Sequence, residues 1–165
     1  MIKTLLVLLA SVISTSSFYE MILENSEGKR IPIEKLKGKS VIVAIIDAKS
    51  AKSDFVAYLD SLQSARRDVQ VLLLPASDLL PNAVIQNTAE IKGSTGLITL
   101  KPSQVKSNSK NRGKLISWLT SVSENGHFEI DGVSANSVFV VSKEGELRSV
   151  LATGFPENAL MDALQ

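Results

Sequence analysis

The sequence contains no cysteine, and this absence excludes more functions than any motif in the chain supports. Without a thiol the protein has no disulfide, no thiolate nucleophile and no cysteine ligand for zinc or an iron–sulfur cluster. Histidine is almost as scarce, because His127 is the only one, so a multi-histidine metal site within one chain is also excluded. Sulfur-based redox chemistry is therefore out of reach for this sequence, and we expect no cofactor.

Excess charge is also lacking, because 18 basic and 17 acidic residues leave a formal net charge of +1. No global electrostatic field therefore draws the protein to nucleic acid or to an anionic membrane. The composition, with 44% hydrophobic and 21% charged residues, is that of an ordinary globular protein. A length of 165 residues suits one domain with its own core.

Residues 1–17 have the layout of a secretory signal peptide: an early lysine, an apolar run from Leu5 to Ile13, and then small residues. The run is shorter than the roughly 20 residues needed to span a bilayer. No cysteine follows it that would carry a lipid anchor. We therefore expect cleavage near residue 17 and a mature domain of residues 18–165 without a transmembrane segment, exported to the periplasm or the cell exterior. The alternative is a buried N-terminal strand or helix.

The rest of the chain alternates strand and helix patterns. A hairpin is expected over residues 18–33, buried strands over 41–46 and 69–74, and between them a helix with Ser53 as its N-cap. A second hairpin is expected over residues 137–152, and a final helix with Pro156 at its first position, carrying Leu160, Met161 and Leu164 on one side. This order predicts an α/β domain with the layout of the thioredoxin fold.

The middle of the chain is less regular. Residues 82–91 are compatible with a short helix and 97–100 with a short strand. A helix is expected after Gly113, with its apolar face formed by Leu115, Trp118, Leu119 and Val122.

Several short motifs, taken in order, resemble the glutathione peroxidase family. They begin at Ser17-Phe-Tyr-Glu, continue through EGKRIPIEKLKGKSVIV and resume at Leu74-Pro75, Trp118-Leu-Thr and Phe139-Val-Val. The resemblance covers essentially the whole mature chain. It implies a thioredoxin-like mixed sheet flanked by helices, with an N-terminal β-hairpin.

The positions that carry chemistry in that family have changed. Ser50 stands where the family has its peroxidatic cysteine or selenocysteine, and Asp78 replaces the family's glutamine. The family's Trp-Asn-Phe motif aligns with Ser134-Ala-Asn, which places Asn136 one position away from the family's asparagine. Peroxide reduction needs a soft, easily deprotonated atom with a reversible oxidation ladder, and a serine hydroxyl has neither property. Ser50 and Asp78 are therefore interpreted as a vestigial pocket with no catalytic residue.

These changes indicate a catalytically inactive protein that acts as a binding or interaction module. The alternative that follows from the resemblance is a peroxidase or other oxidoreductase in the response to oxidative stress, using an external thiol or a bound metal. A hydrolase built on Ser50, Asp78 and His127 is a third class, but no GxSxG elbow surrounds the serine. Asp47 and Asp78 also follow buried strands, where they are either solvated carboxylates or ligands for a cation.

The clearest charge cluster is the basic loop, residues 101–114, with five basic and no acidic residues: Lys101, Lys106, Lys110, Arg112 and Lys114. It contains no aromatic side chain that would stack on a base, so nucleic acid is not the expected partner. The loop is either a solvated surface segment or a binding surface for an unknown protein or an anionic partner in the cell envelope.

Overall fold

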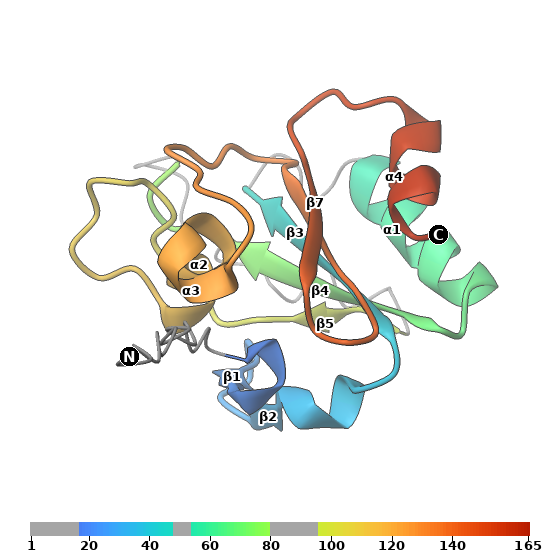
Figure 1. Cartoon of the computed structure of the whole chain (residues 1–165), viewed down its shortest axis with the longest axis horizontal. Helices are drawn as coiled ribbons and strands as arrows, with labels where there is room; N and C mark the ends of the chain where they lie inside the picture. Colours follow the sequence, from blue (N-terminus) through green and yellow to red (C-terminus); the bar gives the residue numbers. More distant parts are fainter. Residues whose placement is uncertain (1–16, 48–53, 80–95) are drawn as a thin grey trace, which may run out of the picture.

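The computed structural model describes residues 17–47, 54–79 and 96–165, and a five-stranded mixed sheet forms its centre (Figure 1). The strand order is β5-β4-β3-β6-β7. The first three of these strands run parallel to one another, whereas β6 is antiparallel to β3 and β7 is antiparallel to β6. The strands are β3 (Ser40–Ile46), β4 (Val69–Pro75), β5 (Ile98–Thr99), β6 (Val138–Val141) and β7 (Leu147–Leu151).

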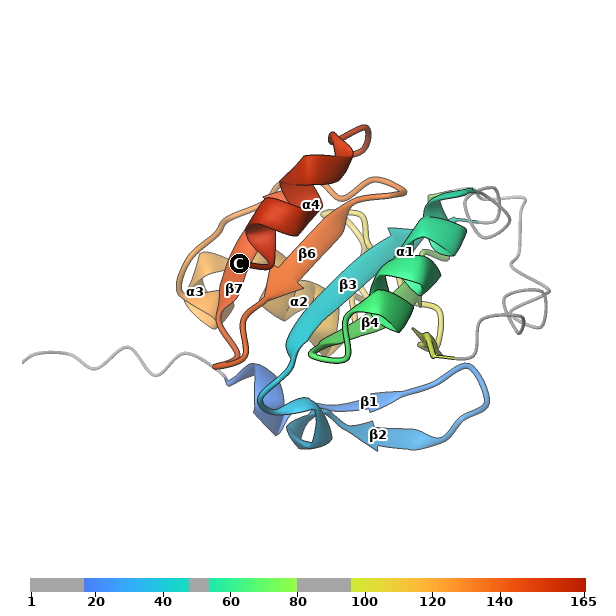
Figure 2. The ribbon, with the colours of Figure 1, turned by 90° about the vertical axis from the view of Figure 1, so that its right-hand side faces the viewer.

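Strand β3 is buried along its whole length because helices cover both faces of the sheet. Alternate side chains of β3 contribute to two separate cores, with Val43 in one and Ala44 in the other. On one face lie α1 (Asp54–Ala65) and α4 (Glu157–Ala163), and on the opposite face α2 (Lys114–Thr120) and α3 (Val122–Asn125) (Figures 1 and 2). The continuous apolar run that predicted a strand buried on both faces is thereby explained.

The N-terminal hairpin is present but shorter than expected. Strands β1 (Ile22–Glu24) and β2 (Arg30–Pro32) pair antiparallel, while Phe18–Glu20 and Ile33–Leu36 form the 3-10 helices η1 and η2. The consecutive residues Phe18 and Tyr19 are both buried. Because a strand points neighbouring side chains to opposite faces, a helical turn is the better way to bury both against one core.

The expected helix after Gly113 ends earlier than its apolar spacing suggested, and the placement of Val122 on its buried face is wrong. Val122 is 46% exposed, and its backbone N–H donates to Glu129 Oε2 at 2.8 Å. The carbonyl of Trp118, which would accept that N–H in a continuing helix, instead accepts from Asn125 Nδ2 at 2.9 Å. The side chains of Glu129 and Asn125 thus take the place of the backbone hydrogen bond from Val122 to Trp118, and the helix ends before it.

The final helix also differs slightly from the expectation. Pro156 is the N-cap of α4 and lies one residue before the helix begins. Leu160 and Leu164 are buried as expected, but Met161 is 39% exposed. A spacing of four residues keeps the two leucines on one face, whereas Met161 is rotated by about 100° from Leu160. The helix expected over 82–91 and the N-cap Ser53 lie outside the described residues.

No helix in the described ranges is long and apolar enough to cross a membrane.

Candidate functional site

Strands β3 and β4 end at the same edge of the sheet, which we call the carboxyl edge and where α/β proteins usually bind ligands. Asp47 directly follows β3, and Asp78 lies three residues after β4. Ser50 lies outside the described residues, so its position relative to Asp78 is not defined. Among the residues that are described, no group of three or more His, Asp or Glu side chains is placed to hold a metal ion.

Asp78 holds the basic loop in place. Its Oδ1 accepts a hydrogen bond from the backbone N–H of Val105 at 2.9 Å. Its Oδ2 accepts from the backbone N–H of Lys106 at 3.0 Å and from Ser109 Oγ at 2.7 Å. Partial burial works against ionisation, but these hydrogen bonds prevail and lower the pKa of the Asp78 carboxyl group. The residue is therefore an ionised anchor that orders a loop.

The five basic residues of the basic loop divide into two groups. Lys101 forms an ion pair with Glu24 at 3.2 Å, which ties the loop to the N-terminal hairpin. Arg112 is half-buried and donates from Nη2 to Thr120 Oγ1 at 2.5 Å, which ties the loop to α2. The other three, Lys106, Lys110 and Lys114, are exposed, as is Lys101 in spite of its ion pair. Figure 1 shows this loop projecting from the body of the domain beside α2.

Asn136 is a third residue of the carboxyl edge that the sequence singled out. Its backbone has a left-handed φ of 64°, and its N–H donates to the carbonyl of Ile45 at 2.7 Å. Its side chain lines a pocket of about 260 Å³ together with Phe55, Tyr58 and Phe155. The structure thus brings the Ser-Ala-Asn segment to the end of β3, next to the start of α1.

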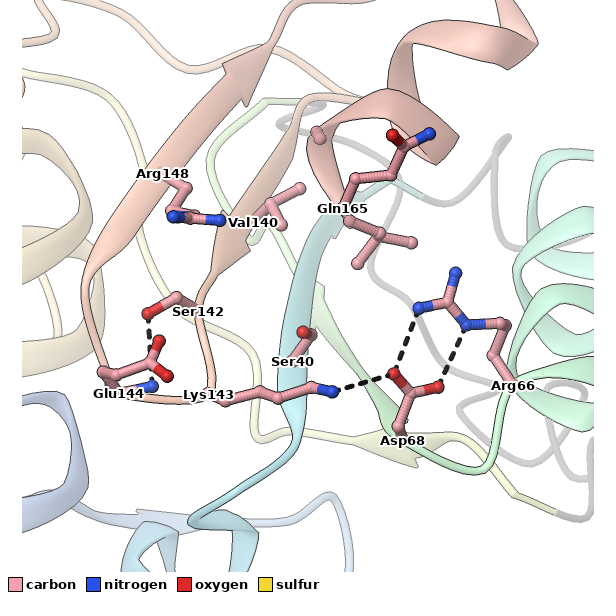
Figure 3. Close-up of a pocket in the computed structure, with 11 residues that line it drawn as sticks. Ser40, Arg66, Asp68, Val140, Ser142, Lys143, Glu144, Arg148 and Gln165 are labelled. Carbon is pink, nitrogen blue, oxygen red and sulfur yellow. Dashed lines mark hydrogen bonds and ion pairs between the residues drawn. The ribbon is translucent and has the colours of Figure 1, made fainter.

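A second and larger pocket, of about 440 Å³, lies at the opposite edge of the sheet, where β3 and β4 begin (Figure 3). Asp68 lies in its wall and accepts two hydrogen bonds from Arg66, each at 3.0 Å. Lys143, from the β6–β7 turn, reaches the same carboxylate at 3.2 Å. The hydrogen bonds from Arg66 and then from Lys143 hold the pKa of Asp68 far below its usual range. This carboxylate joins the end of α1 to the β6–β7 turn.

Asp68 with its partners Arg66 and Lys143, which we call the Asp68 clamp, should make the stability of the fold depend on pH. Because its pKa is lower in the folded state, the clamp contributes stability above the unfolded value of about 3.9, and this stability is lost as the pH falls towards the folded pKa. We expect Asp68→Asn to lower the Tm by a few degrees at most at pH 7, because the clamp is partly exposed. In thermal melts, the difference from the wild type should narrow below about pH 4. A difference that stays constant from pH 7 to pH 2 would contradict this role.

Asn125 is a structural residue that the sequence pattern did not reveal. Its side chain is buried and makes four hydrogen bonds, donating to the carbonyls of Trp118 and Phe128 and accepting from the N–H groups of His127 and Phe128. His127 itself is exposed in the loop that follows α3. The only sequence signal for Asn125 is its place before a glycine, which is common to many turns.

Structural comparisons place this geometry among known folds. The chain superposes on a crystal structure of Trgpx in its apo form with a TM-score of 0.66 and 15% identity, covering 91% of this chain and 94% of the other. For GPX1 of T. cruzi the TM-score is 0.68, with 15% identity and coverage of 90% and 94%. A thiol-disulfide isomerase from Corynebacterium glutamicum gives a TM-score of 0.61 at 12% identity, with coverage of 87% and 89%.

This protein has a thioredoxin-like fold. The similarity to the two glutathione peroxidase structures confirms the fold that the sequence resemblance implied. No protein-family model matches the chain, and no curated protein matches its sequence. The thioredoxin-like core therefore persists in a sequence that has no cysteine.

Proposed function

We propose that this protein is an exported, glutathione peroxidase-like protein that lacks peroxidase activity and acts as a binding or interaction module. The observation that carries the proposal is a thioredoxin-like fold in a chain without cysteine. The chemistry of thiol peroxidases depends on a sulfur or selenium atom that is oxidised and reduced again. The engagement of Asp78 with the basic loop also supports the proposal, because this carboxylate has a structural role.

The direct test is peroxide consumption by the mature protein with an added thiol. We expect no measurable turnover by the wild type. A Ser50→Cys variant is measured beside it, with Ser123→Cys as the control, since Ser123 is an exposed serine on α3. If Ser50 occupies the family's peroxidatic position, the thiol at position 50 should be oxidised at least tenfold faster than the one at position 123, because its pocket would lower its pKa.

Each result of this assay is informative. Turnover by the wild type would overturn the proposal and favour the alternative, an oxidoreductase that uses an external thiol or a bound metal. Equal oxidation of the two introduced thiols would show that Ser50 does not occupy a peroxidatic site. Labelling of the wild type by a fluorophosphonate probe would instead indicate a serine hydrolase, and we expect none.

Export is tested by the mass of the protein recovered from the envelope or the culture medium. The early lysine, the apolar run and the small residues of positions 1–17 support this part of the proposal. We expect a mass that corresponds to cleavage near residue 17. Recovery of the uncleaved chain from the cytoplasm alone would contradict export.

A further inference from the structure

The base of the basic loop contains a small pocket that the sequence did not reveal. It has a volume of about 180 Å³ and lies between the N-terminal hairpin and the start of α2. Apolar side chains from three elements line it, among them Leu23 of β1, Leu74 of β4 and Leu115 of α2. Lys101 and Lys114, the first and last residues of the basic loop, lie at the same pocket. An apolar cavity of about 150 Å³ is large enough to hold a benzene molecule.

The pocket and the exposed lysines belong to the same loop. The loop leaves this pocket at Lys101, carries Lys106 and Lys110 outwards, and returns to it at Lys114. Glu24 also lines the pocket and pairs with Lys101 at 3.2 Å, so a carboxylate of a partner would have to share or displace this ion pair. The surface therefore offers a space for one apolar side chain with Lys101 and Lys114 at its lining, and two further exposed lysines along the same loop.

The loop is also held in one shape. Besides the three hydrogen bonds to Asp78, Ser103 Oγ accepts from the N–H of Gly113 at 3.2 Å, and Gln104 Oε1 accepts from the N–H of Asn111 at 3.3 Å. A loop that is ordered before binding loses less conformational entropy when a partner docks. Asp78 is in this sense a positioning residue for the lysines.

We propose that this surface binds an acidic polypeptide segment that inserts one large apolar side chain into the pocket between Lys101 and Lys114. The inference rests on the proposed function, since it names the partner class of the binding module. A nucleic acid fits less well because the loop has no aromatic side chain for stacking. A membrane fits less well because the apolar residue of the loop, Val105, is fully buried and unavailable for insertion.

The probe is a fluorescein-labelled peptide of ten glutamates with one central phenylalanine, titrated at 50 mM and 150 mM salt and followed by anisotropy. We expect saturable binding that weakens with salt. Replacing the phenylalanine of the probe with alanine should weaken binding about tenfold, as expected for a buried aromatic ring that carries about 1.4 kcal/mol. A peptide whose affinity does not depend on the phenylalanine would overturn the role of the pocket.

Two variants of the protein test the surface. The triple variant Lys106→Gln, Lys110→Gln, Lys114→Gln should weaken binding at least tenfold. The matched control removes the same charge from another part of the chain, through Lys35→Gln, Lys37→Gln and Lys39→Gln, and should change the affinity less than twofold. Equal losses in the two triple variants would overturn the proposal in favour of non-specific electrostatics.

Asp78→Asn separates a shaped surface from a simple excess of charge. Removing a negative charge beside the lysines would strengthen the binding of an acidic peptide if only Coulomb attraction acted. We expect a loss of about threefold or more, because the loop loses its anchor, with circular dichroism confirming that the variant is folded. Stronger binding by this variant would overturn the proposal.

Vesicles with 30% phosphatidylglycerol provide the last comparison. Retention of the protein on these vesicles, with competition against the peptide, would overturn the proposal in favour of a membrane partner. Absence of peptide binding at 1 mM would overturn it as well. Neither result changes the peroxide assay, so a failure here is distinct from a failure of the proposed lack of catalysis.

Discussion

Replacing Asn125 with aspartate is expected to lower the free energy of unfolding by about 4 kcal/mol at pH 7. The amide nitrogen of Asn125 donates to the carbonyls of Trp118 and Phe128 at 2.9 and 3.0 Å. Aspartate puts a negative oxygen where that nitrogen was, so one buried and one partly buried carbonyl lose their donor and face a charge that repels them. Urea unfolding followed by Trp118 fluorescence measures the loss.

The same variant has a characteristic pH dependence. Burial and the facing carbonyls raise the pKa of the new carboxyl group above the unfolded value of about 3.9, so the penalty is small at low pH and grows as the pH rises. Asn111→Asp is the matched control, because Asn111 is exposed in the basic loop, and its effect should stay within about 0.5 kcal/mol. Equal losses in the two variants would show that the hydrogen bonds of Asn125 do not stabilise the fold.

Gly145→Ala is expected to reduce the free energy of unfolding by about 3 kcal/mol. Gly145 has a φ of +90°, and a Cβ added to it would lie 2.6 Å from Cε2 of Tyr19. The Tyr19 ring is held from its other end, because its hydroxyl group donates to the carbonyls of Ser142 and Lys143. Burial raises the pKa of this phenol, so the hydroxyl stays a donor at alkaline pH as well. The ring therefore has little freedom to move away.

Gly154→Ala separates the two causes of this loss. Gly154 has a similar φ of +83°, but an added Cβ would meet nothing within 4 Å. Its variant should therefore lose about 1 kcal/mol, the contribution of the backbone conformation alone. If thermal or urea unfolding gives the same loss for both variants, the contact between Gly145 and Tyr19 is not a constraint.

The parts of the fold that sequence could predict are those with a strong local pattern. The continuous apolar run of β3 indicates a strand that is buried on both faces. The spacing of Leu59 and Leu62 in α1 indicates a helix that is buried along one side. The end of α2 could not be predicted in this way. It depends on Asn125 and Glu129, which occupy positions that a continuing helix would need and which lie beyond the pattern itself.

For the basic loop and Asp78, the sequence could predict which residues are present but not which contacts they make. The lysines of the basic loop are visible as letters, and so is Asp78, but nothing in the sequence connects a carboxylate with backbone N–H groups 27 and 28 residues away. The pairing of Lys101 with Glu24 spans 77 residues and likewise has no local signal in the sequence. Such contacts depend on the sheet that brings the segments together. A count of charges alone therefore groups the five basic residues of the loop, although in the structure two of them bind other parts of the fold.

The hydrogen bond from Tyr19 to the carbonyl of Lys143 joins residues that are 124 positions apart, and this has a consequence for synthesis. At a translation rate of about 5–20 residues per second, roughly 6–25 s pass between the appearance of the two partners. During that interval the side chains of Phe18 and Tyr19 lack the turn and the helix against which they pack, and they remain accessible to water and to chaperones. The domain therefore reaches its native packing only after the β6–β7 turn has been made.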